Sequence, residues 1–309
     1  MFEAIRDIVK RHNVLNHIKK LANKAIFLLQ ETHSEKSDED SYRHIWGTKE
    51  FLLNHGATNS RGTAILFSNI GYKQIFYFSD NVGRLQILSI KLTENDKKLL
   101  IVNIYNPNNE NPQVELLKLL FEKLDEVPNI LEHEIIIGGD WNCILDRNLD
   151  SNGGNPGTKT NTLAEISKIR NKFDLVDIFR AKHPDLKRYT WRCPTPLLNR
   201  RLDYFFISNT LQDCVRTIHI GSSFMSDHSP VQLNFQPVTP LPKGAGIWKF
   251  NATFLKDEAF VTKANDLFDK VESENPNLLP KQLFELIKYE FKKFARKIAM
   301  EKSKNDKKK

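Results

Sequence analysis

Short apolar runs and longer amphipathic stretches alternate along the first 235 residues of the chain. The runs are rich in β-branched and aromatic residues and are bounded by polar turns, which predicts strands. These strands lie at 25–29, 61–67, 75–78, 85–92, 99–105, 135–137, 189–191, 202–207, 215–220 and 231–235. Apolar residues at helical spacing predict helices over 2–23, 114–127 and 163–173. Two polar stretches, 34–40 and 146–161, predict loops, and the length of the second suggests a functional role.

The pattern changes at residues 237–246, where three prolines and two glycines interrupt it. Strand patterns stop there, and 255–271 and 282–300 have the spacing of amphipathic helices, followed by a charged end that we expect to be disordered. We therefore expect a body over residues 1–237 and a linker with a basic helical tail over residues 238–309.

The second of these tail helices carries a stripe of apolar side chains. Its members are Phe284, Ile287, Phe291, Phe294 and Ile298. As a free helix it would expose aromatic surface, so the stripe favours packing on a neighbour absent from this chain. A coiled coil and an RNA-binding element are the alternatives.

Composition indicates the class of partner and the cellular compartment of the protein, but it does not indicate the fold. The chain has 309 residues with a formal charge of +8 and a pI near 9.2, which favours a polyanionic partner. Three widely spaced cysteines form neither a disulfide framework nor a zinc pattern, which suits a reducing compartment. We see no apolar run of membrane-spanning length, and the charged N-terminus is unlike a secretory signal. We expect no membrane association and a location in the nucleus or cytoplasm.

The stretch Gly138-Gly139-Asp140-Trp141-Asn142 follows the apolar run 135–137. A β-branched run closed by two glycines predicts a buried strand that ends abruptly. Asp140 and Asn142 lie two residues apart, so in an extended chain their side chains project to the same side. Such a pair can hold an activated water and a phosphate oxygen. The alternative is an Asx-turn, which Asp and Asn favour for local reasons.

Acidic, amide, phenol or imidazole groups follow apolar runs at five places in the chain. These groups are Glu31, Asn103 with Tyr105, Asp140 with Asn142, Asp203, and Asp227 with His228. Carboxylates crowded at one edge repel one another unless a cation compensates. Hard oxygen ligands without cysteine favour Mg²⁺ or Mn²⁺ over zinc, and such ions commonly act on phosphate. His228 could donate to a phosphoryl oxygen while a carboxylate fixes its tautomer, or it could be an ordinary polar loop residue.

Five ordered motifs carry a family resemblance. They are Leu29-Gln30-Glu31-Thr32-His33, Asn103-Ile104-Tyr105, Gly138-Gly139-Asp140-Trp141-Asn142, Arg201-Leu202-Asp203-Tyr204 and Ser226-Asp227-His228-Ser229-Pro230. In this order they resemble the endonuclease/exonuclease/phosphatase family, which includes apurinic endonucleases and DNase I. The nearest resemblance is to the endonuclease domain of LINE-type (non-LTR) retrotransposon polyproteins. It implies an α+β fold: a four-layer α/β/β/α sandwich, DNase I-like, with two mixed sheets packed face to face, helices outside, and a C-terminal helical extension.

The resemblance also implies roles for the metal and the attacking water. Glu31 would bind the divalent metal, Mg²⁺ or alternatively Mn²⁺, and Asp227 would lie beside it. Asp140 would orient or activate the attacking water, and Asn142 would contact the phosphate.

The remaining implied roles concern the transition state and the substrate. Tyr105 would lie against the transition-state oxygens, and His228 would donate to the phosphate while Asp203 orients it. Thr190 matches a position that contacts substrate. Tyr105 could instead be a core aromatic with its hydroxyl at the rim, and Thr190 a strand residue chosen for β-propensity.

The chain also departs from the family pattern. Arg200 stands where serine is usual, and Trp141 replaces the commoner phenylalanine. The family's first strand carries an asparagine near the metal, and Met1 falls about where that residue should be. We therefore expect an N-terminally shortened fragment of a retroelement protein that lacks a central strand and a reverse transcriptase. Its stability or activity should be lower than that of an intact relative.

Three functions remain open at this point. The first is a Mg²⁺-dependent endonuclease that nicks DNA and leaves a 3′-hydroxyl. The second is a catalytically impaired remnant that only binds nucleic acid, and the third is a phosphatase of the same superfamily. DNA is the expected partner, with RNA a candidate for the basic tail. The sequence leaves the target-site preference and the oligomeric state unspecified.

Overall fold

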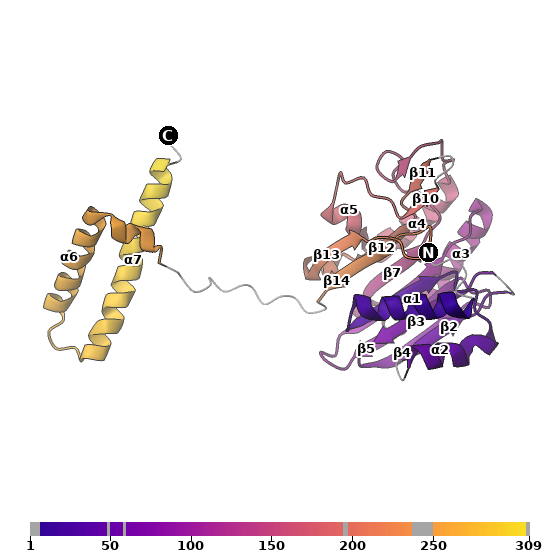
Figure 1. The fold of residues 1–309 in the computed structure, drawn as a ribbon, viewed down its shortest axis with the longest axis horizontal. Helices are drawn as coiled ribbons and strands as arrows, with labels where there is room; N and C mark the ends of the chain where they lie inside the picture. Colours follow the sequence, from indigo (N-terminus) through magenta and orange to yellow (C-terminus); the bar gives the residue numbers. More distant parts are fainter. Residues whose placement is uncertain (1–6, 48–49, 58–59, 194–196, 237–249, 307–309) are drawn as a thin grey trace. The chain divides into compact units, whose positions relative to one another are not determined.

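The computed structural model describes residues 7–47, 50–57, 60–193, 197–236 and 250–306. The chain divides into two units, Met1–Pro240 and Leu241–Lys309, which we call the body and the helical unit. Figure 1 shows the strands and most of the helices gathered in the body.

A six-stranded mixed sheet forms the centre of the body. Its strand order is β4 (Tyr72–Ser79), β5 (Leu85–Leu92), β6 (Lys98–Tyr105), β7 (Glu134–Asp140), β12 (Asp203–Ser208) and β9 (Leu175–Asp177). Strands β6 and β7 run parallel, and the other neighbours pair antiparallel. A parallel pair needs a long crossover, and the chain between β6 and β7 contains the helix α3 (Glu110–Asp125).

Smaller sheets complete the strand layers. Strands β1 (Ala25–Gln30), β3 (Thr63–Ser68) and β2 (Phe51–Asn54) form one sheet in that order, and β13 (Val215–Ile220) pairs with β14 (Val231–Phe235). Another sheet joins β10 (Trp191–Cys193), β11 (Leu198–Arg200) and β8 (Ser151–Asn152). Within the part of the chain that the structure describes, β1 pairs with β3 alone and lies at an edge of its sheet.

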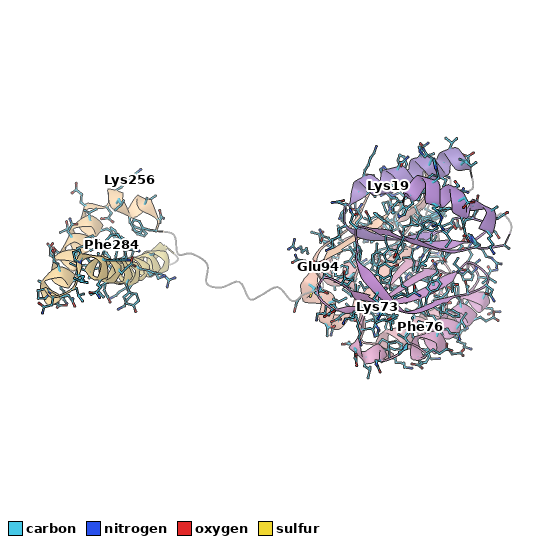
Figure 2. The ribbon with its side chains drawn as sticks, turned by 90° about the horizontal axis from the view of Figure 1, so that it is seen from below. Lys19, Lys73, Phe76, Glu94, Lys256 and Phe284 are labelled. Atoms are coloured by element: carbon cyan, nitrogen blue, oxygen red, sulfur yellow. The ribbon has the colours of Figure 1, made fainter. Side chains whose placement is uncertain are left out.

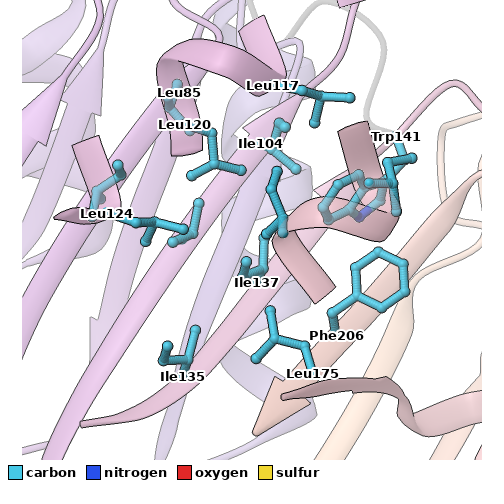
Figure 3. Packing of buried hydrophobic residues seen from close by; sticks show 14 of the residues in the cluster. Leu85, Ile104, Leu117, Leu120, Leu124, Ile135, Ile137, Trp141, Leu175 and Phe206 are labelled. Carbon is cyan, nitrogen blue, oxygen red and sulfur yellow. The ribbon is translucent and has the colours of Figure 1, made fainter. Parts of the chain in front are cut away.

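Four apolar clusters bind the elements of the body together, and side chains fill the space between its layers (Figure 2). Ile65 of β3 packs with Leu88 of β5 and Ile101 of β6, which joins the two sheets face to face. On the other face of the large sheet, α3 and α4 (Thr160–Lys172) cover β7, with Leu120 and Ile137 in one cluster (Figure 3).

The outer face of the small sheet is covered by α1 (Ile8–Leu21) and α2 (Glu39–Trp46). Leu15 and Trp46 pack there against Leu29 and Leu66. The order helix, sheet, sheet, helix confirms the predicted α+β sandwich.

Several local predictions need correction. The predicted loop at 34–40 ends in the helical segments η1 (Lys36–Asp38) and α2, because Tyr42, Ile45 and Trp46 form a buried stripe at helical spacing. We expected a strand over 189–191, but β10 begins only at Trp191. The loop at 146–161 contains the short strand β8. Strand β2 and the helix α5 (Ile178–Lys182) had no predicted counterpart.

The helical unit consists of η4 (Ala252–Lys256), α6 (Glu258–Glu274) and α7 (Pro280–Asp306). Phe291, Phe294 and Ile298 of α7 pack against the buried Phe260 of α6. The expectation of a neighbour absent from this chain is therefore wrong, because α6 of the same chain covers most of the stripe, although Phe284 stays 59% exposed. The end that we expected to be disordered, residues 307–309, lies outside the described residues. Among the described helices, none combines the length and apolarity needed to cross a membrane.

Candidate active site

Three predicted residues stand side by side at one edge of the six-stranded sheet. In the strand register, Asp140 at the end of β7 pairs with Tyr105 at the end of β6 and with Asp203 at the start of β12. Because register partners in a sheet lie about 5 Å apart and point to the same face, the three side chains form one row. The backbone ladder thus brings together residues that are up to 98 positions apart, from Tyr105 to Asp203.

Asp140 is fully buried and is held by Asn142. The Asn142 backbone N–H donates to Oδ1 of Asp140 at 2.9 Å, and Asn142 Nδ2 donates to Oδ2 at 2.9 Å. The second Nδ2 hydrogen goes to the Asn106 carbonyl at 2.9 Å. The Asx-turn and the site are therefore one feature, with Asn142 at φ 44°. Because both amide hydrogens are used within the protein, Asn142 has none left to donate to phosphate.

The neighbouring charges set the protonation of Asp140. Burial, followed by the nearby Asp203 carboxylate, raises the pKa of Asp140 to about 7, while His228 and the Asn142 backbone N–H act in the opposite direction. A carboxyl group with a pKa near neutrality can exchange protons during a reaction.

Asp203 and His228 form an ion pair, with Nδ1 of His228 donating to Oδ2 of Asp203 at 2.8 Å. Burial alone would raise the pKa of Asp203, but the His228 charge and hydrogen bond hold it below its ordinary value. Burial alone would lower the pKa of His228, but Asp203 raises it above its ordinary value. The pair therefore favours the imidazolium, whose Nε2–H has no described acceptor.

Thr190 lies behind this pair. It is fully buried, and its Oγ1 accepts hydrogen bonds from the backbone N–H groups of Leu202 at 2.9 Å and Asp203 at 3.1 Å. We expected contact with substrate, whereas these bonds fix the start of β12.

Glu31 reaches the row from the small sheet. It follows β1 directly, at φ 51°, and the Tyr105 hydroxyl donates to its Oε1. Burial and then Glu31 raise the pKa of Tyr105 far above its ordinary value, so the phenol keeps its proton. This hydrogen bond connects the edges of the two packed sheets.

Asp227 is not brought to Glu31 by any described contact. It is exposed, and its Oδ2 accepts a hydrogen bond from the Trp191 indole at 2.8 Å. Trp191 in turn bridges to the backbone of His228. Consecutive residues thus have different partners, because Asp227 faces Trp191 and His228 faces Asp203.

The donor set suits a hard divalent cation. No group of three His, Cys, Asp or Glu side chains forms a metal-holding cluster within the described ranges. Mg²⁺ usually takes only one or two protein carboxylates and completes its shell with water and phosphate. Glu31 can supply one carboxylate, and burial followed by the Asp203 carboxylate disfavours the negative charge of Asp140, which a nearby cation would favour. The residues therefore fit Mg²⁺ or Mn²⁺ and do not fit a structural zinc site.

Supporting residues were missed by the sequence argument. Lys159 Nζ and Gln113 Nε2 donate to the Asn142 carbonyl at 2.6 and 2.9 Å and hold its left-handed turn. Lys159 lies in the loop at 146–161 that was suspected of function. Arg84 was also missed, and it has a weak sequence cue, a charge just before an apolar strand. Its guanidinium lies 4.7 Å from the Tyr105 ring centroid, and Nη1 donates to the Tyr105 carbonyl at 3.0 Å.

Solved structures share this fold. An AP endonuclease, LMAP from Leishmania major, matches with a TM-score of 0.61 and 19% identity, covering 76% of this chain and 86% of that one. The catalytic domain of APE2 from Xenopus laevis matches with a TM-score of 0.60 and 19% identity, covering 76% of this chain and 89% of that one. A 3′ phosphatase, NExo from Neisseria, bound to product DNA hairpin, matches with a TM-score of 0.55 and 14% identity, covering 73% of this chain and 94% of that one. These likenesses establish a DNase I-like fold.

Sequence comparisons identify the family. The transposon TX1 uncharacterized 149 kDa protein of Xenopus laevis is 27% identical over 245 residues, which are 78% of this chain. The chain spans only 18% of that relative's length. This match confirms the resemblance to transposon-encoded proteins. Residues 2–228 match the profile of the Endonuclease/Exonuclease/phosphatase family. The chain therefore belongs to the endonuclease/exonuclease/phosphatase family.

Proposed function

We propose that this protein is a divalent-metal-dependent endonuclease of the retrotransposon type, which nicks DNA and leaves a 3′-hydroxyl. One observation carries the proposal: the row of Tyr105, Asp140 and Asp203, extended at its two ends by Glu31 and His228. A proton acceptor, a cationic donor and a metal-type carboxylate thus converge at one sheet edge, as phosphodiester hydrolysis requires.

Asp140 is the group that accepts the proton of the attacking water. With a pKa of about 7, Asp140 is about half ionised at neutral pH, and the ionised form can accept a proton. The two hydrogen bonds from Asn142 fix the direction of the carboxylate. Asn142 therefore acts by positioning Asp140, which replaces the phosphate contact expected of it.

His228 stabilises the negative charge that develops on the phosphate. Its Nδ1 is held by Asp203, so the free Nε2–H can donate to a non-bridging oxygen. Thr190 positions Asp203 for its bond to His228, because its Oγ1 accepts from the backbone N–H groups at the start of β12.

Glu31 is the residue that would hold Mg²⁺ or Mn²⁺. Asp227, the exposed residue before His228, is the carboxylate that would lie beside the ion. When bound, such an ion polarises a phosphate oxygen and offsets developing charge. The Tyr105 hydroxyl keeps its proton and donates it to Glu31, which orients that carboxylate. Because this is the only hydrogen of the hydroxyl, donation by Tyr105 to a transition-state oxygen would replace the bond to Glu31.

DNA is the proposed substrate, supported by the charge of +8 and by the transposon-encoded relative. The test is relaxation of a supercoiled plasmid by the whole chain with Mg²⁺, with Mn²⁺ and with EDTA. We expect a relaxed circle in the two metal reactions only, and extension of the nick by a DNA polymerase without prior end treatment. Absence of relaxation at every protein concentration and in both metals would contradict the proposal.

A small phosphate ester in the same buffers tests the phosphatase alternative. We expect no phosphate release from it. Release from the ester without plasmid relaxation would replace the endonuclease assignment with a phosphatase.

A further inference from the structure

A groove of about 700 Å³ adjoins the site at Tyr105. It is lined by the loops around Arg61 and Arg84 and by residues that follow Tyr105, from Pro107 into α3. The scissile bond of a DNA strand is flanked by further nucleotides, which must run across the surface next to the site. Tyr105, Asp140 and Asp203 of the catalytic row are not among the residues that line the groove.

The backbone around Arg61 is fixed by three loops that touch one another. The His33 N–H donates to the Arg61 carbonyl at 2.8 Å, and the Gly62 N–H donates to the Gly83 carbonyl at 3.0 Å. A Cβ at Gly83 would lie 2.7 Å from the Gly62 nitrogen and from the Gly56 Cα, so only glycine allows this approach. Arg61 itself has φ 67°. The loops therefore hold Arg61 beside the turn that carries Glu31.

The two arginines of the groove differ in what they can bind. Arg84 is held by the Tyr105 ring and carbonyl, and the buried Asp80 lies beside it, accepting from the Arg84 N–H at 2.9 Å. Within the described ranges, no side chain or carbonyl accepts a hydrogen bond from the Arg61 guanidinium, which is half-buried at the edge of the groove. Arg61 is thus a cation on a fixed backbone, and the donors of its guanidinium are available.

We propose that the groove receives the DNA strand next to the scissile phosphate, and that Arg61 binds one backbone phosphate of that strand. This assignment rests on the proposed nuclease function and adds a substrate-binding site to it. The fork of a guanidinium matches two phosphate oxygens, and such a contact is independent of base sequence. Glu115 of α3 is an exposed carboxylate that lines the same groove, so it should oppose a phosphate there.

Binding of a labelled DNA duplex to the whole chain in EDTA, measured by fluorescence anisotropy over a series of salt concentrations, tests this site without chemistry. Arg61→Gln should weaken binding about fivefold for any duplex sequence and lower the slope of log Kd against log salt by about one. Arg61→Lys should restore most of the affinity and most of the salt slope. Glu115→Gln should tighten binding about twofold, since it removes a like charge near the phosphates.

Lys73→Ala is the matched control, because Lys73 is exposed near the start of β4, at the other end of that strand from Asp80 (Figure 2). It removes one positive charge away from the groove and should leave the salt slope unchanged. The groove assignment would be overturned if Arg61→Gln kept the Kd and salt slope of the parent. It would also be overturned if Lys73→Ala weakened binding as much as Arg61→Gln.

Plasmid nicking separates this inference from the proposed function. Arg61→Gln should raise KM by about the same factor as Kd and keep kcat within about twofold, because Arg61 lies outside the catalytic row. A parent that nicks DNA alongside an Arg61→Gln protein that binds normally would refute the groove alone. A parent that binds in the predicted way but never nicks would refute the nuclease alone.

Discussion

The two sides of the proposed site are built differently. On the sheet-borne side, Tyr105, Asp140 and Asp203 belong to β6, β7 and β12, and each of these strands is paired on both edges. On the loop-borne side, Glu31 follows the edge strand β1 in a left-handed turn, and its described side-chain contact is the Tyr105 hydroxyl. Hydrogen-bond ladders thus fix the proton-transfer groups, whereas a turn fixes the metal-type carboxylate.

This difference indicates where geometry is most costly to disturb. A group on a doubly paired strand moves only if the sheet moves, whereas a group on a turn can adjust by local rotation. A metal ion that keeps several water ligands tolerates such adjustment, but a proton transfer does not. We therefore expect substitutions on the sheet-borne side to have larger effects than matched substitutions on the loop-borne side.

The largest effect should come from Asp140→Asn. An amide cannot accept the water's proton, so nicking should fall about a thousandfold. The exchange removes the repulsion between Asp140 and Asp203, but it also replaces one of the two oxygens that accept from Asn142 with a donor, so the melting temperature should change little. Plasmid relaxation rates and circular dichroism measure the two quantities. Nicking within tenfold of the parent would show that Asp140 is not the base.

Gly139→Ala should destabilise the strands on the sheet-borne side of the site. Gly139 has φ 144°, and an added Cβ would lie 1.9 Å from the Ile104 carbonyl oxygen on the neighbouring strand. Because backbone must move, the free energy of unfolding of the body should fall by about 3 kcal/mol in urea titrations. Gly157→Ala is the control, since its Cβ meets no atom within 4 Å. Equal stability of the two variants would contradict the rigidity of this side.

His228→Gln should lower nicking about a hundredfold, because the neutral amide cannot supply the imidazolium charge that Asp203 maintains. His219→Gln, at an exposed position of β13, should leave nicking unchanged. The comparison is made on purified, equally folded proteins with the plasmid assay. A loss shared by both variants would point to a general effect of removing histidine.

On the loop-borne side, Glu31→Gln should lower nicking about tenfold at a fixed Mg²⁺ concentration, with recovery as Mg²⁺ is raised. A Gln oxygen can still accept from Tyr105, so the melting temperature should change little. Nicking rates over a Mg²⁺ series measure this. An unchanged Mg²⁺ dependence would remove Glu31 from the metal site.

Gly62→Ala should have the smallest effect. Its φ is 92°, but the atom that an added Cβ would meet is the Thr32 side-chain hydroxyl, at 2.3 Å. A hydroxyl can rotate away whereas a backbone carbonyl cannot, so the loss should be about 1 kcal/mol in the same urea titrations. A loss as large as that of Gly139→Ala would erase the difference between the two sides.

The fold class and the residues proposed for the site could be predicted from the sequence because local patterns survive folding. The apolar runs became strands and the stripe in α3 became a buried helix face, since periodicity follows from backbone geometry. The helical turn at 36–40 was mistaken for a loop because its polar residues hid the stripe that begins at Tyr42.

Local patterns in the chain identified the side chains that could do chemistry, because Glu31 and Asp140 lie at the ends of apolar runs and Asp203 lies beside another. The partners of these side chains followed from the folded arrangement: Asp203 faces His228, Asp227 faces Trp191, and both amide hydrogens of Asn142 stay within the protein. The physical reason is that strand register and loop packing join residues far apart in the chain. Local spacing fixes the direction of a side chain but carries no information about what lies opposite it.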